Sequence, residues 1–134
     1  MTKLSKIEGI GEVYMEKLQA AGIRSVEGLL KAGATPAGRR ALQEQTQISD
    51  TLLLRWINHA DLFRIKGVGE EYSDLLEASG VDTVPELAQR NPENLHQKMA
   101  EVNAEKKLVR QLPALSNVQR WVAHAKELPR VLTY

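Results

Sequence analysis

Two short glycine-containing segments constrain the fold of this chain more than any other feature of its sequence. The first, Ile7–Gly11, reads apolar-x-Gly-apolar-Gly, and the second, Ile65–Gly69, repeats that pattern fifty-eight residues later. Because glycine adopts backbone angles that are closed to other residues, the pattern is typical of a very tight hairpin between two helices. We call these segments the first and the second hairpin. The apolar residue between the glycines is expected to be buried, so that backbone N–H groups at the start of the next helix face outward.

The hairpins belong to a longer internal repeat. Residues 7–30 and 65–88 share ten identities in 24 aligned positions, far more than chance would give. A further match joins residues 55–60 to residues 120–125, so the second copy holds about seven extra residues between 88 and 119. Two copies of one unit therefore organise the chain. We predict a first unit over 1–62, a second unit over 63–128, and a C-terminal tail over 129–134 that docks on the body of the protein.

Local patterns within each copy predict short helices. Apolar residues at helical spacing predict helices over about 12–21 and 70–79, each closed by a glycine. Cap residues predict further helix starts, at Ser25, Thr35, Ser49, Thr83, Asn91 and Ser116. The segment 105–109 is interpreted as an inserted helical turn, stopped by Pro113. No segment shows sustained strand alternation, so the predicted fold class is all-α: tandem duplicated helix-hairpin-helix units of short helices packed into one compact body.

Composition limits the functions that are open to the chain. Cysteine is absent, which excludes disulfides, thiolate zinc sites and cysteine nucleophiles. Lys and Arg number 18 against 17 Asp and Glu; residues 1–62 hold 8 basic and 7 acidic side chains, and residues 63–134 hold 10 of each. Proteins that bind nucleic acid usually carry a basic excess, because phosphate neutralisation supplies most of their affinity. Without a signal segment or an apolar run of membrane-spanning length, the protein is expected to be soluble and cytoplasmic.

Large side chains recur at equivalent positions of the two copies. Their helical spacing predicts that they form the structural core: Tyr14, Leu18, Trp56, Tyr72, Leu76 and Trp121. His59 and His124 are also equivalent, and with His96 they are the only histidines. They belong to no motif with metal-ligand spacing, so no metal site is predicted. No cofactor motif and no catalytic motif is recognisable either, so neither a cofactor, a small-molecule substrate nor enzymatic activity is expected.

The hairpins resemble those of the helix-hairpin-helix superfamily, which read hydrophobic-x-Gly-hydrophobic-Gly before the second helix. The resemblance covers nearly the whole chain, including the Gly22-Ile23 and Trp56…Ala60 elements and their counterparts in the second copy. The sequence also resembles an uncharacterised bacterial family of small tandem helix-hairpin-helix proteins. It is similar, more distantly, to the C-terminal domain of the bacterial RNA polymerase alpha subunit. The superfamily includes DNA binders and protein-interaction modules, so the resemblance implies a fold without fixing the partner.

In DNA-binding members of the superfamily, the hairpin amides hold a phosphate oxygen, and a basic residue after the second glycine adds charge. Carried over to this chain, the resemblance implies hairpin binding candidates and supporting basic residues. The hairpin candidates are Gly9, Ile10, Gly11 and Glu12 in the first copy, and Lys66, Gly67, Val68, Gly69 and Glu70 in the second; the supporting basic residues are Lys6 and Arg64. Lys66 makes the second hairpin the better candidate for binding nucleic acid.

The chain departs from the DNA-binding pattern at both hairpins. Glu12 and the pair Glu70-Glu71 stand where lysine or arginine would help. A carboxylate a few ångströms from a phosphate costs on the order of 1 kcal/mol in a solvated setting. On the structural interpretation, a glutamate in the first turn of a helix simply complements the helix dipole. The adjacent pairs Arg39-Arg40 and Lys106-Lys107 either form exposed helix faces or extend a phosphate-binding surface.

Three functional hypotheses follow. The near-neutral charge and the acidic first turns favour a non-catalytic binding or adaptor module whose partner is another protein. The alternative is sequence-nonspecific binding of double-stranded DNA, in which hairpin backbone amides contact phosphates without reading bases. The third hypothesis is a homodimeric structural protein that self-associates through an apolar patch. No membrane partner is expected.

Overall fold

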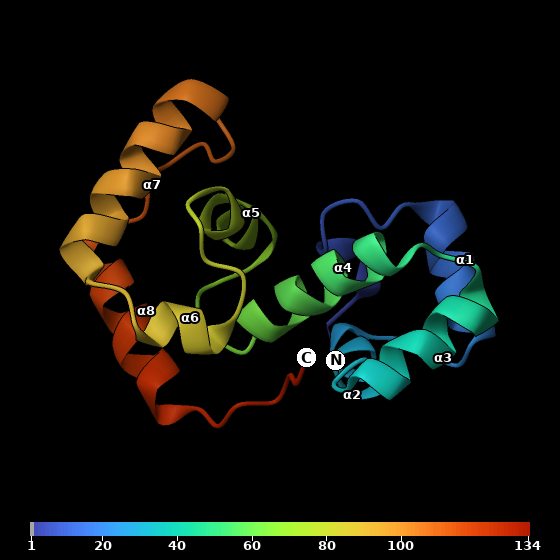
Figure 1. Ribbon diagram of the computed structural model, residues 1–134. Coiled ribbons are helices and arrows are strands. Elements are labelled where there is room, and N and C mark those ends of the chain that lie inside the picture. Colours follow the sequence, from blue (N-terminus) through green and yellow to red (C-terminus); the bar gives the residue numbers. More distant parts are fainter. Residues whose placement is uncertain (1) are drawn as a thin grey trace. The chain divides into compact units, whose positions relative to one another are not determined.

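The computed structural model describes residues 2–134 and is all-α in that range, as predicted (Figure 1). Eight α-helices follow a short 3-10 helix, η1 (Leu4–Lys6), and the described residues form no strand. In chain order they are α1 (Glu12–Ala20), α2 (Val26–Ala32), α3 (Pro36–Thr46), α4 (Asp50–Leu62), α5 (Glu70–Ala78), α6 (Val84–Ala88), α7 (Pro92–Lys106) and α8 (Leu115–Glu127). None of these helices is long and apolar enough to cross a membrane.

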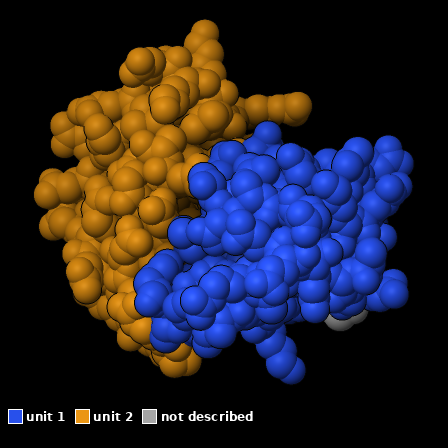
Figure 2. Space-filling view, turned by 45° about the vertical axis from the view of Figure 1, so that its right-hand side comes forward, with its two compact units in different colours: residues 1–61, 131–134 blue, residues 62–130 orange. Residues whose placement is uncertain are grey.

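The chain divides into two compact units, coloured separately in Figure 2. The first unit consists of Met1–Asp61 together with Val131–Tyr134, and the second consists of Leu62–Arg130. Helices α1 to α3 and nearly all of α4 therefore lie in the first unit, and α5 to α8 lie in the second. The predicted tail is split between the units, since residues 129–130 group with the second and residues 131–134 with the first.

Side-chain caps begin four helices where the sequence predicts them. Each cap oxygen accepts a hydrogen bond from a backbone amide three residues later, which satisfies a donor that the first helical turn leaves unpaired. The pairs are Ser25 Oγ with Gly28 N at 3.0 Å, Thr35 Oγ1 with Gly38 N at 3.1 Å, Ser49 Oγ with Leu52 N at 3.2 Å, and Asn91 Oδ1 with Asn94 N at 2.9 Å.

The other two predicted caps behave differently. Thr83 is the N-cap residue of α6, but its hydroxyl donates to the Glu86 carboxylate at 3.1 Å and caps no amide. The cap prediction for Ser116 is wrong, because the N-cap residue of α8 is Ala114, two residues earlier, and the helix begins at Leu115. The extended backbone of Ala114, which follows the buried Pro113, allows the helix to begin before the serine.

The extra residues of the second copy lengthen α7 and form the segment 107–114, so the predicted inserted helical turn over 105–109 is wrong. Helix α7 ends at Lys106, and Lys107 follows in the left-handed conformation with φ 52°. The Asn103 side chain then holds the next segment in a non-helical path: its Oδ1 accepts from Val109 N at 3.0 Å, and its Nδ2 donates to Val109 O at 3.2 Å. A buried Val109 anchors the segment in the core of the second unit.

That core is a single cluster of buried apolar side chains. It draws on every helix of the second unit and on the second hairpin, and it comprises Leu62, Ile65, Val68, Leu75, Leu76, Val81, Val84, Leu87, Leu95, Met99, Val109, Val118, Trp121, Val122 and Ala125. Helix α8 packs against α6 and α7, and α5 packs against α7. The cluster thereby fixes α8 and the second hairpin within one body.

Residues 131–134 dock on the first unit, as predicted for the tail. Thr133 N donates to Ala34 O at 2.9 Å, and Leu132 is buried. Arg39 holds this segment: its Nη1 donates to Gly33 O at 2.8 Å and its Nη2 donates to Thr133 O at 2.6 Å. Because Arg39 is only 6% exposed, the interpretation of Arg39-Arg40 as an exposed or phosphate-binding pair is wrong for its first member.

Candidate binding site

Both hairpins are built on the same four-residue turn. In the first, Ile10 N donates to Ile7 O at 3.2 Å; in the second, Val68 N donates to Ile65 O at 3.0 Å. The third residue of each turn is a glycine with positive φ, 93° at Gly9 and 96° at Gly67, as in a type II turn. Ile10 and Val68 are each 5% exposed and anchor the hairpins from inside.

A tryptophan lies directly beneath the turn glycine in each unit. A Cβ atom added at Gly9 would stand 3.2 Å from the indole nitrogen of Trp56, and one added at Gly67 would stand 3.1 Å from that of Trp121. The hairpin tyrosines complete each packing unit, with ring centroids 5.1 Å apart for Tyr14 and Trp56 and 5.3 Å apart for Tyr72 and Trp121. The predicted core residues Leu18 and Leu76, each four residues after its hairpin tyrosine, are fully buried.

The second glycine of each hairpin is the N-cap of the following helix and lies in open space. Gly11 and Gly69 have negative φ values, −87° and −120°, and no atom lies within 4 Å of a Cβ added at either position. Neither α1 nor α5 has a side-chain cap on its first-turn amides. The fold therefore requires glycine at positions 9 and 67, whereas at positions 11 and 69 it leaves the backbone accessible from outside.

The charged candidates around the hairpins have different surroundings. Glu12 is exposed, Glu70 is half-buried, and Val13 beside the first hairpin is 65% exposed. Lys6 is exposed, whereas Arg64 is half-buried and donates from Nη1 to Pro129 O at 2.9 Å. Part of the Arg64 guanidinium is thus engaged in holding the end of α8.

The second hairpin continues into a groove of about 640 Å³ within the second unit. Lys66 and Gly67 form its wall on the hairpin side, and Tyr72 and Trp121 line it beside them. The Tyr72 hydroxyl donates to Gln111 O at 3.2 Å, so the inserted segment 107–114 fixes the ring in place. Trp121 is 4% exposed, so most of its ring is packed inside the second unit. We call this feature the α8 groove.

Helix α8 supplies the remaining lining of the α8 groove through Asn117, Arg120, Ala123, His124 and Glu127. Arg120 Nη2 donates to Asn117 Oδ1, one turn earlier on the same helix. His124 Nδ1 accepts from Lys66 N at 3.4 Å, which ties the helix to the second hairpin. The groove therefore combines an aromatic floor with a rim of three basic side chains and one carboxylate.

The sequence predicted Lys66 and Gly67 as binding candidates but not the groove that they line. The repeat match did align residues 120–125 with residues 55–60, and it ascribed Trp121 to the core alone. Helical spacing from Trp121 would have placed Asn117, His124 and Glu127 near one face of α8. It could not show that this face lies beside the second hairpin, because that placement depends on the packing of α8 against α6 and α7.

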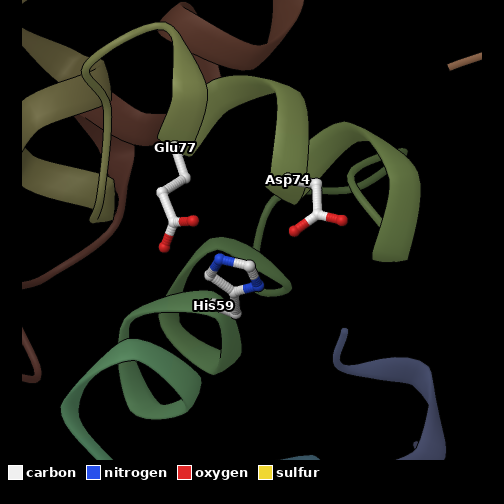
Figure 3. A group of neighbouring side chains, drawn as sticks. All are labelled: His59, Asp74 and Glu77. Atoms are coloured by element: carbon white, nitrogen blue, oxygen red, sulfur yellow. The ribbon is translucent and has the colours of Figure 1, made fainter. Parts of the chain in front are cut away.

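His59, His96 and two carboxylates of α5 also have interaction partners in the described chain. His96 Nε2 donates to Pro113 O at 2.8 Å. His59 is fully buried on α4, and Asp74 and Glu77 lie about one turn apart on α5 (Figure 3). Each of these three has an interaction partner in the described chain, and we assign no ligand role to any of them.

Comparison with known proteins places this architecture in a family. A family model described as "Domain of unknown function (DUF4332)" matches residues 8–128. No solved structure matches the chain. The matched range includes most of the first hairpin, the whole second hairpin and the α8 groove, and it covers well over half of the sequence. The chain therefore belongs to the family described as domain of unknown function DUF4332.

Proposed function

We propose that this chain is a non-catalytic protein-binding module of the helix-hairpin-helix type, and that the second hairpin and the α8 groove hold a segment of a partner protein. One observation carries the proposal: the groove of about 640 Å³ continues from Gly67 across an aromatic floor formed by Tyr72 and Trp121. Binding sites commonly have volumes of roughly 300–1,000 Å³, apolar and aromatic linings and a few polar groups that fix orientation. Tyrosine, tryptophan and arginine are also the residues enriched at energetically dominant contacts between proteins.

The geometry of the hairpins supports the helix-hairpin-helix assignment. Each turn has positive φ at its glycine, buries the apolar residue between the glycines, and is followed by a helix without a side-chain cap. The same arrangement in both copies agrees with a duplicated unit of that superfamily.

The chemistry of the groove favours binding over catalysis. Among its described lining residues there is no serine, threonine or cysteine, and the hydroxyl of Tyr72 is engaged in its hydrogen bond to Gln111 O. Glu127, Arg120 and Lys66 are all exposed to solvent. Exposed charges on a broad groove suit the recognition of a partner.

Binding of double-stranded DNA is the second candidate, and one observation favours it. Gly11 and Gly69 leave the uncapped first turns of α1 and α5 accessible from outside, and a phosphate oxygen could accept from those amides. The exposed Glu12, Val13 and Glu71 stand beside the same amides and offer no positive charge. We therefore rank a protein partner first.

A displayed random-peptide library, selected against the whole chain, tests the proposed function. Ala123 is exposed and lines the α8 groove, so Ala123→Trp should fill the groove without disturbing the core. Ala104→Trp is the matched control, because Ala104 is exposed on α7 and does not line the groove. We expect enriched peptides that bind the wild type and Ala104→Trp but not Ala123→Trp. A library that yields no enrichment, or peptides that bind all three proteins equally, would contradict the proposal.

Fluorescence anisotropy with a labelled DNA duplex, at low and at moderate salt, tests the second candidate. Backbone binding would give an affinity that falls steeply as salt rises and falls again in Lys66→Glu. Absence of binding at low salt rules the DNA candidate out. Light scattering of the free chain separates both from the homodimer hypothesis, which requires a dimer in solution.

A further inference from the structure

The basic side chains of the α8 groove are not neutralised within the fold. Arg120 donates to the neutral amide oxygen of Asn117, and no carboxylate bonds to Arg120 or Lys66 among the described residues. Glu127 is the one acidic side chain that lines the groove. Lys66 and Arg120 against one carboxylate leave a formal excess of one positive charge, in a protein whose whole formal charge is +1.

The aromatic floor of the groove favours contact with an apolar group of a ligand. Tyr72 is half-buried and held by its hydrogen bond to Gln111 O, and Trp121 is packed beneath Gly67. Both rings are therefore fixed before any ligand arrives. A rigid aromatic surface binds an apolar side chain at little cost in conformational entropy.

The two copies have diverged at this face. Lys66 of the second copy stands where Glu8 stands in the first, and Glu127 stands where Leu62 stands. His124 is half-buried and Arg120 is exposed, whereas their counterparts His59 and Arg55 are fully buried and half-buried. The basic, accessible version of the face thus belongs to the second copy.

We propose that the α8 groove selects an acidic segment of a partner protein, in which a carboxylate side chain meets Arg120 and Lys66 and a neighbouring apolar side chain packs on Tyr72 and Trp121. This inference rests on the proposed protein-binding function and specifies its ligand. A nucleic acid fits the same face less well, because its closely spaced phosphates would also meet Glu127. A peptide places one carboxylate at the basic rim and keeps neutral residues elsewhere.

Three fluorescein-labelled degenerate peptide pools test the inference on the full chain. In the first pool each peptide carries one Asp or Glu among Leu, Phe and neutral polar residues; in the second, Asn or Gln replaces that acid; in the third, Lys or Arg replaces it. We expect the acidic pool to bind at least about tenfold more tightly than the amide pool, and the basic pool to bind most weakly, because the rim contacts are electrostatic. The preference for acid should shrink as salt rises.

Charge reversal at two α8 residues, one that lines the groove and one that does not, tests where the peptides bind. Arg120→Glu should weaken binding of the acidic pool roughly tenfold and leave the amide pool nearly unchanged. Lys126→Glu makes the same change of charge on the same helix, at an exposed residue that does not line the groove, and should have little effect. If both variants lose affinity for the acidic pool equally, the effect is nonspecific electrostatic attraction to the protein, and the inference is overturned.

The inference and the proposed function fail in different ways. If the random library yields groove-dependent peptides that are neutral or basic, the acidic preference is wrong while protein binding stands. If no peptide of any composition binds, both are wrong. If light scattering shows a dimer that Arg120→Glu dissociates, the acidic segment belongs to a second copy of this chain and the inference of a different partner is overturned.

Discussion

At the scale of single residues, the turn glycine and the tryptophan beneath it determine the shape of each hairpin. Gly9 and Gly67 have positive φ, and the indole nitrogens of Trp56 and Trp121 approach where a Cβ would stand. A side chain at either glycine therefore meets two penalties, one from the backbone angle and one from the ring below. The contact also couples the hairpin to the helix that carries the tryptophan, α4 in the first unit and α8 in the second.

We expect Gly9→Ala and Gly67→Ala to lower the free energy of unfolding by about 1–3 kcal/mol each, the range for a non-glycine residue held at strained backbone angles. Urea unfolding followed by circular dichroism measures the change. Gly11→Ala and Gly69→Ala are the controls, since both positions have ordinary negative φ and open space around the added methyl group. Equal losses at all four positions would contradict the assignment of different roles to the two glycines of each hairpin.

Sequence alone could not distinguish those two glycines. The apolar-x-Gly-apolar-Gly pattern predicted the hairpins, their burial of Ile10 and Val68, and the repeat that relates them. The pattern gave no reason to assign different roles to the two glycines, because the identity of a residue does not determine its φ angle. The tryptophan contact was also beyond its reach, since Trp56 lies far along the chain from Gly9 and meets it only through the packing of α4.

At the scale of helices, the sequence correctly predicted those helix starts that are set by a local side-chain cap. Ser25, Thr35, Ser49 and Asn91 act as caps because each oxygen reaches an amide of its own first turn, an interaction that needs no tertiary context. The prediction for segment 105–109 was wrong because the path of the chain there depends on Asn103. The side chain of Asn103 binds both backbone groups of Val109, six residues later. The α8 groove was not predicted for a similar reason: it depends on the packing of α8 against α6 and α7, which no local sequence pattern specifies.

Asn91→Ala should destabilise the protein by about 1 kcal/mol, the usual cost of losing a side-chain cap. Ser116→Ala is the matched comparison, because the sequence predicts a cap there and the structure places Ser116 inside the first turn of α8. We expect Ser116→Ala to change the unfolding free energy by less than about 0.5 kcal/mol, as most surface substitutions do. Thermal unfolding of both variants under one set of conditions measures the two losses. A larger loss of stability for Ser116→Ala than for Asn91→Ala would show that Ser116 caps α8, as the sequence predicts.

At the scale of the whole molecule, the last residues of the chain complete its first unit. Leu132 is 2% exposed, Thr133 bonds to Ala34, and the Tyr134 hydroxyl donates to Asn58 Oδ1 at 3.0 Å. The first unit is thus assembled from both ends of the sequence, which a repeat alignment cannot reveal because these residues have no counterpart in the first copy. Arg39 is the residue on which this closure depends.

Arg39→Met should lower the free energy of unfolding of the first unit by about 1–3 kcal/mol. The substitution keeps the aliphatic stem but removes the donors to Gly33 O and Thr133 O, together with the guanidinium that lies 5.4 Å from the centre of the Tyr134 ring. Trp56 fluorescence in a Trp121→Phe background reports on that unit, since Trp56 is then the only tryptophan. Arg40→Met, at the exposed neighbouring position, is the control and should change stability by less than about 0.5 kcal/mol. Equal effects of the two substitutions would mean that the bonds from Arg39 to Gly33 O and to the terminal segment add nothing to the stability of the fold.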